Sequence, residues 1–142
     1  MRAIPVVGRW RIYAICNARR EAQAVEFLVP GGPEDRHAGS KRQMWAYLEH
    51  VAQLPNPPRN TAVSHYIDEE NRILEFIKGD IRLVYFFDED TTIILSHCFL
   101  KDGQKTPKAQ LVRARSNQVA YFQAKEKRDL RYFTLAGDNL YG

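Results

Sequence analysis

Three hydrophobic runs between residues 71 and 100 lie so close together that they constrain the fold more than any other feature. The runs read NRILEFIK, GDIRLVYFF and TTIILSHCFL, and their Ile, Val, Phe and Tyr side chains favour strands. Lys78-Gly79-Asp80 lies where the first two runs meet, and only Asp88-Glu89-Asp90 separates the last two. Connections this short join antiparallel neighbours. The sequence therefore predicts a three-stranded antiparallel meander.

The segments before the meander predict one strand and two helices. RWRIYAIC, residues 9–16, alternates with period two, as a strand does. EAQAVEFLV, residues 21–29, has helix-forming residues, and residues 41–54 show an apolar stripe of helical period. TAVSHYIDEEN, residues 61–71, fits either an irregular segment or a short strand. The register of the first hairpin also stays open at this point.

A long helix is predicted after the meander. Thr106 is suited to cap its N-terminus and Pro107 to be its first residue. The helix runs to about residue 127. The expected buried stripe contains Leu111, Ala114, Gln118 and Phe122, widened by Val119. The order of elements predicts an α+β fold, in which helices pack on an antiparallel sheet.

Composition predicts an intracellular globular protein. The chain has 142 residues, of which 44% are hydrophobic and 27% charged, a balance typical of a folded domain. No apolar run reaches the roughly 18 residues that a membrane-spanning helix needs, and the N-terminus lacks the pattern of a signal peptide. We expect a cytoplasmic location and no membrane partner. Cys16 and Cys98 have neither disulfide-framework nor zinc-ligand spacing.

Basic residues are concentrated between the end of the last predicted strand and the first half of the long helix. Five basic residues face a single acid there: Lys101, Lys105, Lys108, Arg113 and Arg115, against Asp102. In the predicted meander, Lys78 and Arg82 lie on the neighbouring strands and come within reach of Lys101. Cations gathered on a sheet indicate an anionic partner, because unpaired charge is too costly to bury in a core. The alternative is an ion-pair network with Glu75, Asp80 and Asp88.

Motifs for cofactors and metals are absent from the sequence. There is no GxxxxGK[ST] loop, no GxGxxG, no HExxH and no histidine cluster at metal spacing. We therefore expect neither a cofactor nor a metal. His97 lies inside a hydrophobic run and is interpreted as a structural histidine.

One stretch resembles a known family. LSHCFLKDGQKTP, residues 95–107, is similar to LLHGFVKKTQKTP of the RelE/HigB-type toxins of bacterial and phage toxin–antitoxin modules. The letters that match are Leu95, His97, Phe99, Lys101, Gln104, Lys105, Thr106 and Pro107. Upstream, LEFIKGDIRLVYFF resembles the strand pair ELR…YRVLYF of the same family. The chain departs from the pattern at Cys98, Asp102 and Gly103, and Asp102 subtracts one charge from the cluster.

The resemblance implies a fold, an activity and partners. The fold is the compact α+β one of microbial ribonucleases, with residues 1–142 as a single RelE/HigB-like domain, 1–8 as an N-terminal extension and 128–142 as a C-terminal tail. The activity is that of a type II toxin, a metal-independent endoribonuclease (mRNA interferase) that cuts mRNA, either on the ribosome or free, and so inhibits translation. A cognate helix-turn-helix antitoxin neutralises it. Two alternatives stay open on the same fold: a non-catalytic RNA- or ribosome-binding protein, and a phage-encoded protein-interaction factor.

The resemblance also assigns site residues. Arg82 becomes a phosphate clamp, since arginine binds phosphate oxygens through two parallel bonds. Lys101 and Lys105 become charge stabilisers or proton-transfer groups. Tyr85 points to the opposite sheet face from Arg82 and is expected in the core. The expected RNA-binding residues are Lys78, Lys108, Arg113, Arg115 and Tyr121, the last with helix packing as its alternative.

Overall fold

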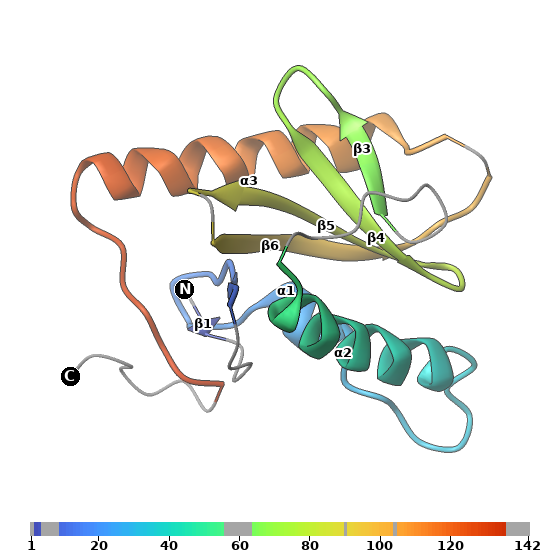
Figure 1. Cartoon of the computed structure of the whole chain (residues 1–142). Helices are drawn as coiled ribbons and strands as arrows, with labels where there is room; N and C mark the ends of the chain where they lie inside the picture. The colour runs from blue at the N-terminus through green and yellow to red at the C-terminus, as the bar shows by residue number, and fades with distance from the viewer. Residues whose placement is uncertain (1, 4–8, 56–63, 90, 104, 136–142) are drawn as a thin grey trace.

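A six-stranded sheet organises the chain, with strand order β1-β2-β6-β5-β4-β3 (Figure 1). The computed structural model describes residues 2–3, 9–55, 64–89, 91–103 and 105–135. The strands are β1 Arg2–Ala3, β2 Arg11–Ala14, β3 Ser64–Asp68, β4 Ile73–Lys78, β5 Ile81–Asp88 and β6 Thr92–Leu100. The helices are α1 Gln23–Phe27, α2 Ala38–Gln53 and α3 Lys108–Glu126. The predicted α+β class is thus confirmed.

The antiparallel meander is confirmed and gains a fourth strand. β4 pairs with β5, and β5 with β6, both antiparallel. The β4–β5 loop has two residues, and Gly79 adopts φ +57° at its first position, a conformation that glycine reaches without steric cost. The ambiguous segment contributes β3, which pairs antiparallel with β4 at the edge of the sheet. Residues 61–63 of that segment lie outside the described part of the chain.

The sheet is mixed rather than purely antiparallel, which corrects the prediction. β2 runs parallel to β6, with Ile12 opposite Ile93 and Ala14 opposite Leu95. A parallel pair needs a long crossover connection. Here α1 and α2 follow β2 along the chain, before the remaining strands. Local periodicity predicts a strand at β2 but carries no information about this distant neighbour.

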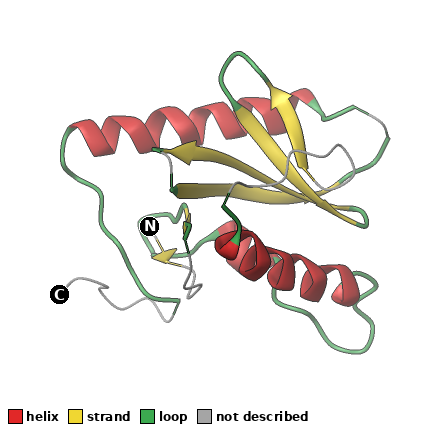
Figure 2. Cartoon of the chain, in the orientation of Figure 1, coloured by secondary structure: helices red, strands yellow, loops and turns green. Residues whose placement is uncertain are grey.

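Helices cover both faces of the sheet (Figure 2). α1 and α2 pack on one face through a core that includes Met44, Leu48, Phe76 and Leu83. α3 packs on the other face, where Ala114 joins a smaller cluster of buried side chains. Apolar burial on both faces is the main stabilising contribution to such a three-layer arrangement. In the described part of the chain, no helix has the length and apolar character needed to cross a membrane.

The start of α3 and its buried stripe differ from the prediction. Pro107, not Thr106, occupies the N-cap position, and no side chain caps the helix there. The buried residues of α3 are Ala114, Gln118 and Tyr121, whereas the predicted stripe contained Phe122, which is 38% exposed. A rotation of the buried stripe by about one residue accounts for the exchange, because neighbouring helix positions lie about 100° apart.

The described part of the C-terminal tail folds back onto the domain (Figure 1). Leu130 and Tyr132 pack against the cluster around Tyr13, and Phe133 is buried beneath the guanidinium of Arg20, 4.3 Å from the ring centre. Residues 136–142 lie outside the described part. Of the predicted N-terminal extension, residues 2–3 form β1 against β2, while residues 1 and 4–8 are not described.

Candidate functional site

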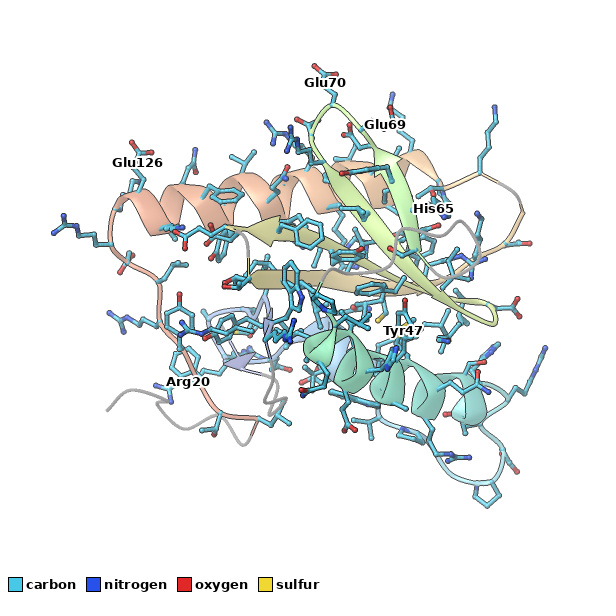
Figure 3. All side chains as sticks on the ribbon, viewed as in Figure 1. Arg20, Tyr47, His65, Glu69, Glu70 and Glu126 are labelled. Atoms are coloured by element: carbon cyan, nitrogen blue, oxygen red, sulfur yellow. The ribbon has the colours of Figure 1, made fainter. Side chains whose placement is uncertain are left out.

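The register of the β4–β5 hairpin places Lys78 and Arg82 on opposite faces of the sheet. Ile77 pairs with Arg82, and Lys78 pairs with Ile81, so strand alternation turns Arg82 toward the α3 face and Lys78 toward the α2 face. The ammonium of Lys78 lies 4.4 Å from the ring centre of Tyr47, which is labelled on α2 in Figure 3. The prediction that Lys78 comes within reach of Arg82 is therefore wrong, and its RNA-binding role stays a prediction.

Arg82 and Lys101 lie on the same face of neighbouring strands. Arg82 pairs with Phe99, and Lys101 follows two residues later, so both side chains start on the α3 face. The hairpin turn holds the guanidinium of Arg82, whose Nη1 donates to the carbonyls of Gly79 at 2.7 Å and Ile81 at 3.2 Å. The backbone N–H of Lys101 donates to the Asp80 carbonyl at 2.8 Å, which fixes where the lysine leaves the sheet.

Between these cations lies a buried carboxylate that the sequence analysis placed only in an ion-pair network. Glu75 is fully buried on β4. Its Oε1 lies 3.0 Å from Nε2 of His65 on β3 and 3.7 Å from Nε of Arg82. Figure 3 shows His65 at the end of the sheet where α3 begins. We name His65, Glu75, Arg82 and Lys101 the Glu75 cluster.

Two opposing effects act on the pKa of Glu75. Burial raises the pKa of Glu75, and the nearby charges of His65, Lys101 and Arg82 lower it, with burial the stronger effect. Desolvation disfavours the charged carboxylate, whereas cations favour it. Arginine stays protonated throughout.

The remaining predicted cations do not gather in one place. Lys105 and Lys108 are exposed near the start of α3, and no described contact links them to the Glu75 cluster. Arg115 donates from Nη1 to Oε1 of Gln118 at 2.7 Å, and its positive charge helps to lower the pKa of Asp68. Arg113 instead lines a cavity of about 270 Å³ on another side of α3. The basic run after β6 is thus spread around the helix instead of forming a single surface.

Tyr121 is a packing residue, which corrects its prediction as an RNA-binding residue. Its ring is 5% exposed and packs edge-on against Phe86, as expected for the helix-packing alternative. Its hydroxyl donates to Oδ2 of Asp88, and Lys125 Nζ lies 2.7 Å from Oδ1 of the same carboxylate. Burial raises the pKa of Tyr121, and the bond to Asp88 raises it further. Tyr121, Asp88 and Lys125 together fasten α3 to the end of β5.

The structural interpretation of His97 is confirmed. A β-bulge at Ser96 brings Ser96 and His97 toward α3 together. Asn117 Nδ2 donates to Ser96 Oγ at 2.9 Å, Ser96 Oγ lies 2.8 Å from His97 Nδ1, and His97 Nε2 donates to Gln110 Oε1 at 2.8 Å. Burial lowers the pKa of His97 to about 4. Both ring nitrogens are occupied, so this histidine is not available for catalysis.

The core prediction for Tyr85 is also confirmed. Its ring stacks on Phe76 with centres 3.9 Å apart, and its hydroxyl lies 2.7 Å from Ser64 Oγ. This contact is on the α2 face, opposite Arg82. Tyr85 therefore supports the sheet beneath the cluster without reaching it.

A cavity of about 580 Å³ lies apart from the Glu75 cluster. It runs between α3, the loop after β2 and the C-terminal tail, and Cys16, Arg20, Ala120 and Leu130 are among its lining residues. None of the cluster residues lines it. The chemistry-bearing side chains thus lie at the opposite end of α3 from this hollow.

The family comparison covers the cluster. The family described as Phage derived protein Gp49-like (DUF891) matches residues 35–118, more than half of the chain, and that span includes all four cluster residues. No curated protein matches the chain. The family is associated with toxin–antitoxin modules. The chain therefore belongs to the Gp49-like family of phage-derived proteins.

Proposed function

We propose that this protein is the toxin of a type II toxin–antitoxin module, a RelE/HigB-type endoribonuclease that cuts mRNA on the ribosome in the cytoplasm. The observation that supports it best is the meeting of Arg82 and Lys101 on one sheet face beside Glu75 and His65. Membership of a toxin–antitoxin-associated family supports the same conclusion. The residues are suited to a cleavage that needs no metal.

RNA carries its own nucleophile, so such an enzyme needs only to move protons and stabilise charge. The 2′-oxygen attacks the adjacent phosphorus, and the 5′-oxygen leaves with a proton. Arg82 is suited to bind a phosphate oxygen through Nη2, because Nη1 donates to the carbonyls of Gly79 and Ile81 and Nε is buried near Glu75, and a charge-assisted bond from a guanidinium is a strong one. Lys101 stabilises the crowded negative phosphorane and gives a proton to the 5′-oxygen.

Lys105 and Lys108 have a different place in the proposal. Both are exposed next to the segment that follows Lys101, where flanking nucleotides would run. Exposed lysines bind a polyanion through long-range attraction that weakens with salt. We therefore assign them to RNA binding and reserve the chemical step for the Glu75 cluster. This moves Lys105 from a catalytic to a binding role.

The direct test is cleavage of a defined mRNA by the purified chain, with and without translating ribosomes. We expect products that end in a 2′,3′-cyclic phosphate and a 5′-hydroxyl, also in the presence of EDTA. A matched RNA with a single 2′-deoxy nucleotide at the cleaved position should stay intact. Lys101→Ala should cut slowly, and its circular dichroism should match the wild type.

Two results would contradict the proposal. If the wild type leaves mRNA intact under both conditions, the protein is not a ribonuclease. Salt-dependent RNA binding without cleavage would then favour a binding protein on the same fold. If EDTA abolishes cleavage, the chemistry is not metal-independent.

The toxin role has a separate test in cells. Induction of the wild type in bacteria should arrest growth, and co-expression of a cognate helix-turn-helix antitoxin should relieve the arrest. Harmless expression at a level comparable with that of a known toxin would contradict the toxin role, whatever the purified protein does to RNA.

A further inference from the structure

The register of the sheet sets Glu75 beside Arg82 on the α3 face. Glu75 pairs directly with Val84 across β4 and β5, and Arg82 lies two residues before Val84, on the same face of β5. Diagonal neighbours of this kind are within reach of a long side chain. Nε of Arg82 lies 3.7 Å from Oε1 of Glu75, and the side chains of Arg82 and Glu75 are only 14% and 0% exposed. The two opposite charges therefore face each other in a place that largely excludes water.

The guanidinium of Arg82 is held at two of its three nitrogens. Nη1 donates to the carbonyls of Gly79 and Ile81, and Nε faces the carboxylate of Glu75. Because a guanidinium is planar, contacts at two nitrogens fix the direction of the third. That third nitrogen is Nη2, which the proposed function assigns to the phosphate.

The bonds at Nη1 alone do not set this direction. Both of their acceptors belong to the hairpin turn, and a planar group held at one end can still swing about that end. Glu75 supplies the second anchor from β4, which lies between β3 and β5 in the sheet. The carboxylate is itself confined on its other side, where Nε2 of His65 lies 3.0 Å from Oε1.

Stability alone does not explain a carboxylate at position 75. Oε2 of Glu75 and Nε of Arg82 are buried atoms without a hydrogen-bond partner in the described part of the chain, whereas buried polar atoms are nearly always paired. Buried ion pairs contribute little net stability, because the cost of taking charge out of water offsets the attraction. The neighbouring buried side chains on this face, Ile73 and Val84, are apolar. These observations favour a functional reason for Glu75.

We propose that Glu75 is a positioning residue of the ribonuclease site: its carboxylate holds the guanidinium of Arg82 so that Nη2 is aimed at the phosphate before RNA binds. This assignment rests on the proposed ribonuclease function and extends it to a buried residue that does not touch RNA. A donor that is already in place needs no reorganisation when negative charge develops on the phosphorane.

The test compares Glu75→Gln with the wild type. The single-turnover rate of RNA cleavage should fall by about 10- to 100-fold, because a misplacement of about 1 Å costs up to about 100-fold. Affinity for an RNA with a 2′-deoxy nucleotide at the cleaved position, measured by fluorescence anisotropy, should be unchanged or higher, because the variant removes a negative charge from the site. Glu70→Gln is the matched control: Glu70, labelled in Figure 3, is exposed at the turn between β3 and β4, and its variant should keep both values.

A double-mutant cycle shows through which residue Glu75 acts. An Arg82→Ala chain has no guanidinium left to aim, so adding Glu75→Gln to it should change the cleavage rate by less than about twofold. Circular dichroism melts show whether each variant is folded. If Glu75→Gln does not fold, Glu75→Asp takes its place. Glu75→Asp keeps the charge but draws it away from Nε by one methylene, and it should slow cleavage in the Arg82 chain only.

The outcomes are distinguishable. Unchanged cleavage by the folded variant overturns the assignment and leaves the ribonuclease function standing. Weaker binding in step with slower cleavage also overturns it, because that indicates a distorted site, and so does equal slowing with and without the Arg82 side chain. If the wild type itself cuts no RNA, the ribonuclease function fails, and the assignment fails with it. Slower cleavage with intact binding, absent from the Arg82→Ala chain, supports both.

Discussion

Replacing Tyr121 with phenylalanine should destabilise the protein without affecting RNA cleavage. The substitution removes one hydroxyl and keeps the buried ring, so it leaves no cavity of consequence. Oδ2 of Asp88 loses its donor, while Lys125 stays 2.7 Å from Oδ1. Leaving a buried acceptor unpaired costs about 1–3 kcal/mol. Because Lys125 still balances the charge, we expect a loss near the middle of that range, about 2 kcal/mol.

The expected change in melting temperature follows from chain length. Unfolding entropy of about 2.1 cal/mol/K per residue amounts to about 0.3 kcal/mol/K for 142 residues. A loss of about 2 kcal/mol then lowers Tm by about 7 °C. Differential scanning calorimetry at neutral pH measures it. Tyr121→Ala should lose more, because a buried aromatic deletion adds a cavity and costs about 3–5 kcal/mol.

A double-mutant cycle identifies the partner. Asp88→Asn, Tyr121→Phe and the double variant should show a coupling energy of about 1 kcal/mol or more, as contacting residues do. Two results would refute the reasoning. A Tyr121→Phe variant that melts within about 1 °C of the wild type would show that the bond contributes nothing. A variant that is folded at the assay temperature but fails to cut RNA would place Tyr121 at the RNA instead.

Two further predictions concern His97 and Gly79. Burial lowers the pKa of folded His97 from 6.5 to about 4, so the unfolded chain binds a proton at His97 more readily than the folded chain does. The stability that neutral His97 contributes is therefore complete above about pH 6.5 and is lost as the pH falls toward 4. Urea unfolding should show that His97→Gln removes up to about 3 kcal/mol of the stability difference between pH 7 and pH 4, and an unchanged pH dependence would contradict this. Gly79→Ala should cost about 1–2 kcal/mol, because Gly79 has φ +57° and an added Cβ would lie 2.5 Å from Ser40 Oγ. Gly32→Ala, where a Cβ meets nothing within 4 Å, is its control in thermal melts, and equal melting temperatures for the two variants would be the opposing result.

Local patterns were sufficient for much of the fold. The meander follows from short connections between hydrophobic runs, and α3 follows from its length and its Pro107 entry. The parallel contact between β2 and β6 could not be predicted in the same way, because strand pairing over about 80 residues leaves no periodic mark on either segment. β3 stayed ambiguous because its residues, apart from Ser64, are half-buried at the sheet edge, so its apolar alternation is weak.

The candidate site was predictable in part. Arg82 and Lys101 came from the resemblance to the family pattern, and the structure brings both to Glu75. Lys78 was misplaced because its face depends on the hairpin register, which the sequence left open until the two-residue turn was known. Glu75 had a signal of its own, since a lone acid inside the apolar run ILEFI is expensive to bury without a purpose. His65 had none, because it becomes Glu75's neighbour only through the pairing of β3 with β4.

The most direct test of a phosphate site on the α3 face compares Arg82→Ala with Lys78→Ala. Both substitutions remove one positive charge at the same hairpin, but from opposite faces of the sheet. Single-turnover cleavage of one mRNA should fall by about 10²–10³ in Arg82→Ala, the usual cost of losing one charge-stabilising donor, and should stay near the wild-type rate in Lys78→Ala. Equal rates in the two folded variants, or a greater loss in Lys78→Ala, would contradict a phosphate site on that face.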